Sequence, residues 1–163
     1  MRFYIYLVIG FSFICGCASS AKYTRPVSYP TLTHIEKIDY SKRFIWPVNG
    51  RVVALFGSVN ADRVNKGIDI KTQMQEEVRA SSDGQVVFCG DIRGFGLTII
   101  IRHAYNMYTL YSNNAKVFVK NQQDVRKGDI ISLVGIDPWS KESVLHFEVR
   151  KNNNPIDPLS VLN

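Results

Sequence analysis

The sequence contains few of the residues that mark chains without a packed core. Its 163 residues include only 11 glycines, 6 prolines and 3 cysteines, while 45% of them are hydrophobic. This composition excludes collagen-like, low-complexity and disulfide-rich chains, and indicates a globular protein. The 20 Lys and Arg residues exceed the 14 Asp and Glu residues, but they are scattered and form no basic run. No nucleic-acid partner is therefore expected.

A long hydrophobic run is also missing. The apolar stretch from Phe3 to Cys15 is shorter than the roughly 20 residues that a membrane-spanning helix needs, but it suits the hydrophobic part of a signal peptide. The segment Ile14-Cys15-Gly16-Cys17 resembles the lipobox of bacterial lipoproteins, in which the last cysteine is lipidated. We therefore expect a signal peptide at residues 1–16 and a membrane anchor on Cys17. Ala18 favours the outer membrane, with the protein facing the periplasm; an ordinary secretory signal is the alternative.

The residues that follow predict an extended tether and then one domain. Residues 17–43 are rich in Ser, Thr, Tyr and Pro and have no sustained apolar period, which is typical of a linker. Residues 44–163 are long enough for a domain with its own core. This part keeps only Cys89, so it can form no intramolecular disulfide, and we expect the thiol to be buried as a small hydrophobe.

Short apolar runs separated by turn residues predict the fold of residues 44–163. Strands are expected at Arg51 to Phe56, Gly67 to Ile70, Gly84 to Cys89, Leu97 to His103, Met107 to Tyr111, Asp129 to Val134 and Val144 to Lys151. Helix signals are nearly absent, except that Asp157-Pro158 can begin one closing turn. The sequence therefore predicts an all-β domain, an antiparallel sandwich or barrel-like structure.

A set of motifs in the same region resembles a LytM domain, the fold of the lysostaphin-type zinc endopeptidases that cut peptidoglycan cross-links. The resemblance covers essentially all of residues 44–163. It depends on Trp46-Pro47-Val48-x-Gly50, Phe56-Gly57, Lys66-Gly67-Ile68-Asp69-Ile70, Gly94-Phe95-Gly96, Thr109-x-Tyr111, Lys127-Gly128-Asp129, His146-Phe147-Glu148-Val149 and Ile156-Asp157-Pro158.

The resemblance also shows where the catalytic residues of this family are missing. Active members bind zinc with an H-x-x-x-D pair and the second His of H-x-H, and use two further histidines, in H-x-H and Y-x-H, for the chemistry. Here Asp69 and His146 remain, but Asn65, Asn113 and Val144 stand at the other positions. Because catalytic zinc normally needs three protein ligands and a nearby acid or base, we expect neither a zinc cofactor nor hydrolysis.

The other candidate groups have structural explanations. His103 ends a predicted strand, at a position that the family does not use as a ligand, so we expect a structural role. His34 falls in the tether and is expected to be solvated. Glu148 is a carboxylate without a metal, which does not make a peptidase.

Exported LytM domains with degenerate sites resemble the activators of N-acetylmuramoyl-L-alanine amidases, of the EnvC and NlpD type. This resemblance implies a non-catalytic lipoprotein of the cell envelope that activates an amidase during daughter-cell separation. Two alternatives remain open: a peptidoglycan-binding scaffold, which would sediment with sacculi, and a residual zinc endopeptidase, which chelators would inhibit.

Strand alternation predicts which residues line the former active-site groove. If His146 faces the groove, residues two and four positions away face it as well. The predicted partner-binding groove consists of Lys66, Asp69, Phe95, Val144, His146, Glu148 and Arg150. It would have an apolar centre and basic flanks at Lys66 and Arg150, suited to an amphipathic helix of the amidase.

Overall fold

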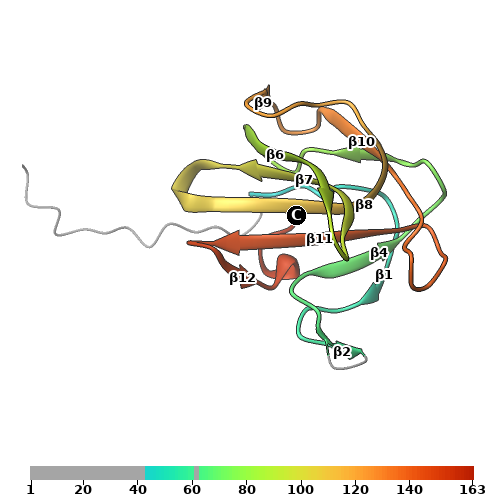
Figure 1. The fold of residues 1–163 in the computed structure, drawn as a ribbon. Helices are drawn as coiled ribbons and strands as arrows, with labels where there is room; N and C mark the ends of the chain where they lie inside the picture. The colour runs from blue at the N-terminus through green and yellow to red at the C-terminus, as the bar shows by residue number, and fades with distance from the viewer. Residues whose placement is uncertain (1–42, 61–62) are drawn as a thin grey trace, which may run out of the picture. The chain divides into compact units, whose positions relative to one another are not determined.

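The computed structural model describes residues 43–60 and 63–163 (Figure 1). The predicted signal peptide at residues 1–16, the lipid site Cys17 and His34 lie outside the described residues, as does the tether apart from its last residue. Among the residues that are described, no helix is long and apolar enough to cross a membrane.

The described chain consists of short and medium strands with two single-turn 3-10 helices. In chain order they are β1 (Arg51–Ala54), β2 (Val59–Asn60), β3 (Arg63–Val64), β4 (Ile68–Lys71), β5 (Glu77–Arg79), β6 (Gly84–Ile92), β7 (Gly96–Arg102), η1 (Ala104–Asn106), β8 (Met107–Val117), β9 (Asp124–Val125), β10 (Ile130–Val134), β11 (Val144–Lys151), β12 (Asn154–Ile156) and η2 (Pro158–Ser160).

One large antiparallel sheet contains most of these strands. Its main path runs β1-β4-β11-β8-β7-β6-β9, while β12 pairs with β11 and β10 pairs with both β5 and β8. The strands β2 and β3 form a separate hairpin (Figure 1). The prediction of an all-β antiparallel domain is confirmed.

Strand β8 changes its partner at Asn113. Its first part, up to Ser112, pairs with β11, whereas the part from Asn114 to Val117 pairs with β10. Between them Asn113 has a φ of 62°. Asn tolerates this left-handed conformation better than most residues, so the sequence provides the bend where the sheet branches.

The core is built from alternate residues of the long strands, as expected for sheets with one buried face. Ile68, Ile70, Ile99, Ile101 and Phe147 are fully buried. The ring centroids of Tyr111 and Phe147 lie 5.3 Å apart across the β8–β11 pair. This core fixes the three strands β4, β11 and β8 side by side, and these strands carry the former ligand positions.

The differences from the predicted elements follow from strand length. Strands β2, β3, β5, β9 and β12 span only two or three residues and were not predicted, because so short a segment shows no period. The predicted closing turn is confirmed: η2 begins after Asp157, whose Oδ1 accepts from Leu159 N at 2.9 Å.

His103 and Cys89 occupy different depths in the domain. His103 is buried, as predicted for a structural histidine, and its ring lies within 2.7 Å of both Asp83 O and Thr109 Oγ1. Burial lowers the pKa of His103, so the neutral ring is favoured. Cys89 is only half-buried rather than buried, but it packs against the core, and burial raises the pKa of its thiol.

The hydroxyl of Tyr111 continues this buried polar network. It accepts from Ser81 N at 2.9 Å and hydrogen-bonds the Thr109 hydroxyl at 3.0 Å. Tyr111→Phe is expected to lower the free energy of unfolding by about 1–3 kcal/mol, because the Ser81 N–H loses its partner. Urea unfolding measures this change. Tyr108→Phe, on a half-buried side chain of the same strand, should change stability by less than about 0.5 kcal/mol; equal losses would contradict the network.

Candidate functional site

A row of alternating charges lies along one face of β11. The ring Nε2 of His146 lies 3.2 Å from Glu148 Oε1, and Arg150 Nε donates to Glu148 Oε2 at 2.7 Å. These residues are two positions apart, so the strand period places them on one face. The Glu148 side chain is fully buried, whereas those of His146 and Arg150 are 14% and 32% exposed. Strand β11 therefore presents an ion-paired row whose centre is inaccessible to water.

Asp69 extends the row from the neighbouring strand. In the pairing of β4 with β11, Asp69 is opposite His146, and its Oδ1 lies 2.7 Å from His146 Nδ1. The approach of the two strands depends on Gly67, because a Cβ there would lie 2.1 Å from Phe147 O. Glycine before β4 is thus the local feature that brings Asp69 to His146.

The hydrogen bonds of His146 determine its protonation. Carboxylates only accept hydrogen bonds when ionised, so a ring that bonds Asp69 through Nδ1 and Glu148 through Nε2 carries a proton on both nitrogens. Burial by itself lowers the pKa of His146, but the two hydrogen bonds and the charges of the carboxylates raise it to about 9. Burial raises the pKa of Glu148, yet His146 and Arg150 hold it below its ordinary value. The row is therefore a chain of paired ions at neutral pH.

Phe95 stands beside this row. The ring centroids of Phe95 and His146 are 5.6 Å apart, with the planes tilted by 55°. Phe95 lies in the turn between β6 and β7, and its carbonyl accepts from Asn113 N at 3.0 Å. The turn is thereby tied to the bend of β8. The structure brings together Asp69, Phe95, His146, Glu148 and Arg150 from the predicted groove.

The positions where the family's ligand histidine (Asn65) and its two catalytic histidines (Asn113 and Val144) are missing have other contacts. Asn65 Oδ1 accepts from Gly67 N at 3.0 Å, while its Nδ2 is buried without a hydrogen-bond partner among the described residues. Asn113 Nδ2 donates to Asp137 Oδ1 at 3.4 Å. Val144 is buried, with 5% of its surface exposed. None of the three supplies an imidazole nitrogen to the site.

These residues do not fit the zinc ion that the fold family implies. Both ring nitrogens of His146 are engaged by carboxylates, Nδ1 by Asp69 and Nε2 by Glu148, so a metal would have to displace one of these hydrogen bonds. The amide nitrogen of Asn65 is a donor, and Val144 offers only hydrocarbon. Within residues 43–60 and 63–163, no group of three or more His, Cys, Asp or Glu side chains is placed to hold a metal. The donor groups that are present form a charge-paired row.

The basic flanks of the predicted groove differ from expectation at one position. Arg150 is not a free flank, because its guanidinium is paired with Glu148. Reversing its charge would bring two carboxylates together and disturb the fold, so such a variant is a poor test of partner binding. Lys66 is exposed and has no ion pair with a described carboxylate. Lys66 is thus the better position for a charge-reversal experiment.

Two residues near the site were not predicted from the sequence. Arg63 in the β2–β3 hairpin places its Cζ 5.2 Å from the ring centroid of Trp139, which is 71% exposed. Trp139 belongs to the loop between β10 and β11. A tryptophan in the polar segment Asp137-Pro138-Trp139-Ser140 was an available signal, since exposed aromatics in loops are common at binding surfaces.

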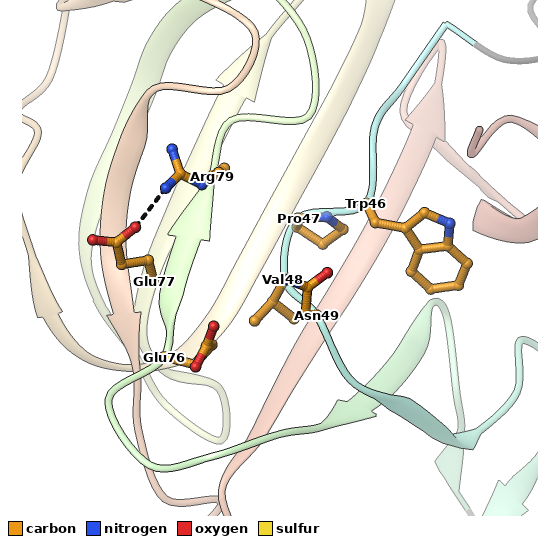
Figure 2. Close-up of a pocket in the computed structure, with 7 residues that line it drawn as sticks. All are labelled: Trp46, Pro47, Val48, Asn49, Glu76, Glu77 and Arg79. Atoms are coloured by element: carbon orange, nitrogen blue, oxygen red, sulfur yellow. Dashed lines mark hydrogen bonds and ion pairs between the residues drawn. The ribbon is translucent and has the colours of Figure 1, made fainter.

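A separate depression lies beside β5 and includes none of the predicted groove residues. Its volume is about 380 Å³, including the solvent space at its open side. It is lined by Trp46, Pro47, Val48, Asn49, Glu76, Glu77 and Arg79. Figure 2 shows β5 on one side, with the Glu77–Arg79 ion pair at 2.5 Å, and the Trp46–Asn49 segment on the other. Trp46 points away from the carboxylates in this view. The depression is shallow and polar, and it carries no part of the His146 row.

The model of Peptidase family M23 matches residues 63–158. The murein hydrolase activator NlpD of Salmonella dublin is 33% identical over 147 residues, which cover 85% of this chain and 38% of that protein. Outer membrane antigenic lipoprotein B of Histophilus somni is 38% identical over 115 residues, covering 70% of this chain and 33% of that protein. This chain thus matches well under half the length of either relative.

A solved structure supports the same assignment. A zinc-containing peptidase from Vibrio cholerae superposes with a TM-score of 0.66 and 26% identity, covering 73% of this chain and 40% of that one. The region that the family model matches, residues 63–158, includes β4 and β11, the strands that carry Asp69 and His146. The chain therefore belongs to Peptidase family M23, as a LytM domain with a degenerate site that is similar to the NlpD murein hydrolase activators.

Proposed function

We propose that this protein is a non-catalytic activator of an N-acetylmuramoyl-L-alanine amidase, which acts on peptidoglycan during daughter-cell separation. The observation that supports the proposal is the continuous row of ion pairs from Asp69 through His146 and Glu148 to Arg150. These ion pairs engage the polar side-chain atoms that a peptidase would need to bind a metal and a water molecule. The NlpD relatives are named murein hydrolase activators, which supports a role in controlling such a hydrolase.

The chemistry of the site argues against hydrolysis by the family mechanism. General acid–base catalysis needs a group that exchanges protons with water or substrate. Asn113 carries an amide, which does not titrate, and Val144 has no exchangeable side-chain proton. Glu148 is fully buried, and its two oxygens are engaged by His146 and Arg150, so it is not placed to exchange protons with water or substrate. We propose that the protein acts without zinc.

The same residues make a suitable binding surface. The ion pairs hold the side chains of Asp69 and His146 in place. Because these side chains are already ordered, the entropic cost of binding a partner is low. Phe95 adds an apolar ring next to His146, and Lys66 adds an exposed positive charge at the end that precedes β4. A partner segment with apolar and acidic residues fits this combination.

The cell envelope is the proposed location. One relative is named an outer membrane lipoprotein, and the lipobox-like segment at Cys17 predicts a lipid anchor. We infer that the anchor holds the domain on the periplasmic side of the outer membrane, where peptidoglycan and its amidases are located.

Release of dye from labelled peptidoglycan tests the proposed function. The purified protein alone is expected to release no dye, and mixing it with an amidase of the same organism should increase the rate of that amidase. Lys66→Glu and Phe95→Ala should reduce the stimulation about tenfold, because each removes a contact of about 1.4 kcal/mol. Lys120→Glu and Phe118→Ala are the matched controls, since they change the same residue types at other exposed positions.

Other outcomes of this assay identify the alternatives. Chelator-sensitive release by the protein alone would overturn the proposal in favour of a zinc endopeptidase. Absence of stimulation, together with sedimentation of the protein with sacculi, would overturn it in favour of a peptidoglycan-binding scaffold.

A further inference from the structure

The loop that carries Trp139 contacts Asn113 through Asp137 and exposes an aromatic surface. The Trp139 indole is 71% exposed, and Ile136 in the same loop is 46% exposed. Water-exposed tryptophan is unfavourable for the isolated domain, and tryptophan is the side chain most enriched among the residues that dominate protein–protein binding energy. The packing of the fold therefore does not explain why the Trp139 indole is exposed.

The loop holds Trp139 in a defined place. Asp137 Oδ2 accepts from Ser140 N at 2.7 Å, and the backbone pairs Asp137 N with Glu142 O and Lys141 N with Asp137 O at 2.9 Å. On the other side, the guanidinium of Arg63 lies over the indole ring at 5.2 Å. The aromatic ring is thus ordered before any partner arrives, which lowers the entropic cost of binding.

The same contacts connect Trp139 to the groove. Asp137 accepts from Asn113 Nδ2, at the bend beside Phe95. Arg63 is in the hairpin that ends at Asn65, and Asn65 is hydrogen-bonded to Gly67, just before β4 and Asp69. Trp139 and Arg63 therefore lie at the end of two contact paths that both lead to the His146 row. A segment bound beside Asn113 and Asn65 would therefore lie next to the Trp139 loop and the Arg63 hairpin.

The charges around Trp139 define the chemistry of that segment. Arg63, Lys66 and Lys141 are exposed and have no carboxylate partner among the residues that the structure describes. The carboxylates of the loop already have partners: Asp137 accepts a hydrogen bond from Ser140 N, and Glu142 forms an ion pair with Lys71 at 2.5 Å. An apolar anchor with unpaired cations around it complements an apolar residue flanked by acidic side chains.

We propose that Trp139, ordered by Arg63, is the anchor of a docking surface for an acidic, amphipathic segment of the activated amidase. This inference rests on the proposed function and extends the binding surface beyond the groove predicted from the sequence. Trp139 contacts the partner, and Arg63 both positions the indole and offers its N–H groups to a carboxylate.

Tryptophan fluorescence of the full-length protein tests the inference. The chain has only two tryptophans, so Trp46→Phe leaves Trp139 as the single reporter. Titration with each purified amidase of the same organism should shift the Trp139 emission to shorter wavelength as the indole loses water. Trp139→Ala should weaken binding about thirtyfold or more, and Arg63→Glu should weaken it more than Arg63→Ala does. Trp46→Ala is the matched control and should leave the affinity unchanged.

Each alternative result has a distinct meaning. Because Trp139 is largely exposed, Trp139→Ala is expected to keep the wild-type melting temperature, which separates lost binding from lost folding. If the wild-type protein binds and stimulates an amidase and Trp139→Ala does so equally well, the docking surface is wrong and the proposed function stands. If the wild-type protein binds no amidase, both are wrong. A Trp139 shift caused by sacculi or anionic vesicles without amidase would overturn the assignment of the partner.

Discussion

Replacing Glu148 with Gln is expected to lower the free energy of unfolding by about 3 kcal/mol, because breaking a buried ion pair leaves charges without compensation. Glu148 is fully buried and accepts from both His146 and Arg150. Its loss therefore affects two cations at once. For a domain of this size the change corresponds to a fall in melting temperature of roughly 10 °C, measured by calorimetry or by circular dichroism during heating.

The exposed pair of Lys71 and Glu142 provides the control. The side chains of this pair are 41% and 45% exposed, and their nitrogen and oxygen lie 2.5 Å apart. Exposed ion pairs contribute little, so Glu142→Gln should cost less than about 1 kcal/mol. Similar losses for Glu148→Gln and Glu142→Gln would show that the buried row does not stabilise the domain.

The stability of the domain is expected to fall as the pH rises from about 6.5 through about 9. The pKa of His146 is about 9 in the folded protein and 6.5 ordinarily, so the folded state binds the proton more tightly in this range. The contribution is fully present below pH 6.5, decreases by up to about 1.4 kcal/mol per pH unit, and is lost above pH 9. The full change is about 3 kcal/mol.

Urea unfolding at several pH values measures this dependence. His146→Gln should be less stable at pH 6 and should lose most of the slope between pH 6.5 and 9. Burial also raises the pKa of the Cys89 thiol, which adds a smaller slope of the same sign, and Cys89→Ser in both proteins removes it. Equal slopes with and without His146 would contradict the protonated row.

The central contacts of the site could be predicted from the sequence because they depend on local pattern. The strand period placed His146, Glu148 and Arg150 on one face, and the Lys66-Gly67-Ile68-Asp69 motif placed Asp69 near them. The resemblance to LytM domains then identified Asn65 as the position of a missing ligand histidine, and Asn113 and Val144 as those of missing catalytic histidines. These inferences needed only the alternation of a strand and the spacing of motifs.

The remaining features depend on contacts between distant segments. Nothing in the sequence around Arg150 shows that its guanidinium is paired with a fully buried Glu148, since both residues also occur on solvated strands. The contact of Arg63 with Trp139 joins the β2–β3 hairpin to the loop between β10 and β11, and the two-residue strands of that hairpin show no period. Pairs so far apart in sequence leave no period to read.

The ion-paired row also connects neighbouring strands through side-chain contacts of the protein itself. In a zinc site the metal would connect residues of neighbouring strands. Here the hydrogen bond between Asp69 and His146 connects β4 with β11, and Glu148 carries the connection to Arg150 along β11. The side chains are fixed by their own charges, which gives this face of the sheet a rigid surface.

The most direct test of the account follows backbone amide signals of isotope-labelled protein by NMR during two titrations. Adding the amidase should shift or broaden the signals of Asp69, Phe95, Trp139 and His146, while adding an equimolar amount of zinc should leave these signals unchanged. Zinc-dependent shifts at Asp69 and His146, without any response to the amidase, would contradict a binding role for the site and would indicate a metal centre.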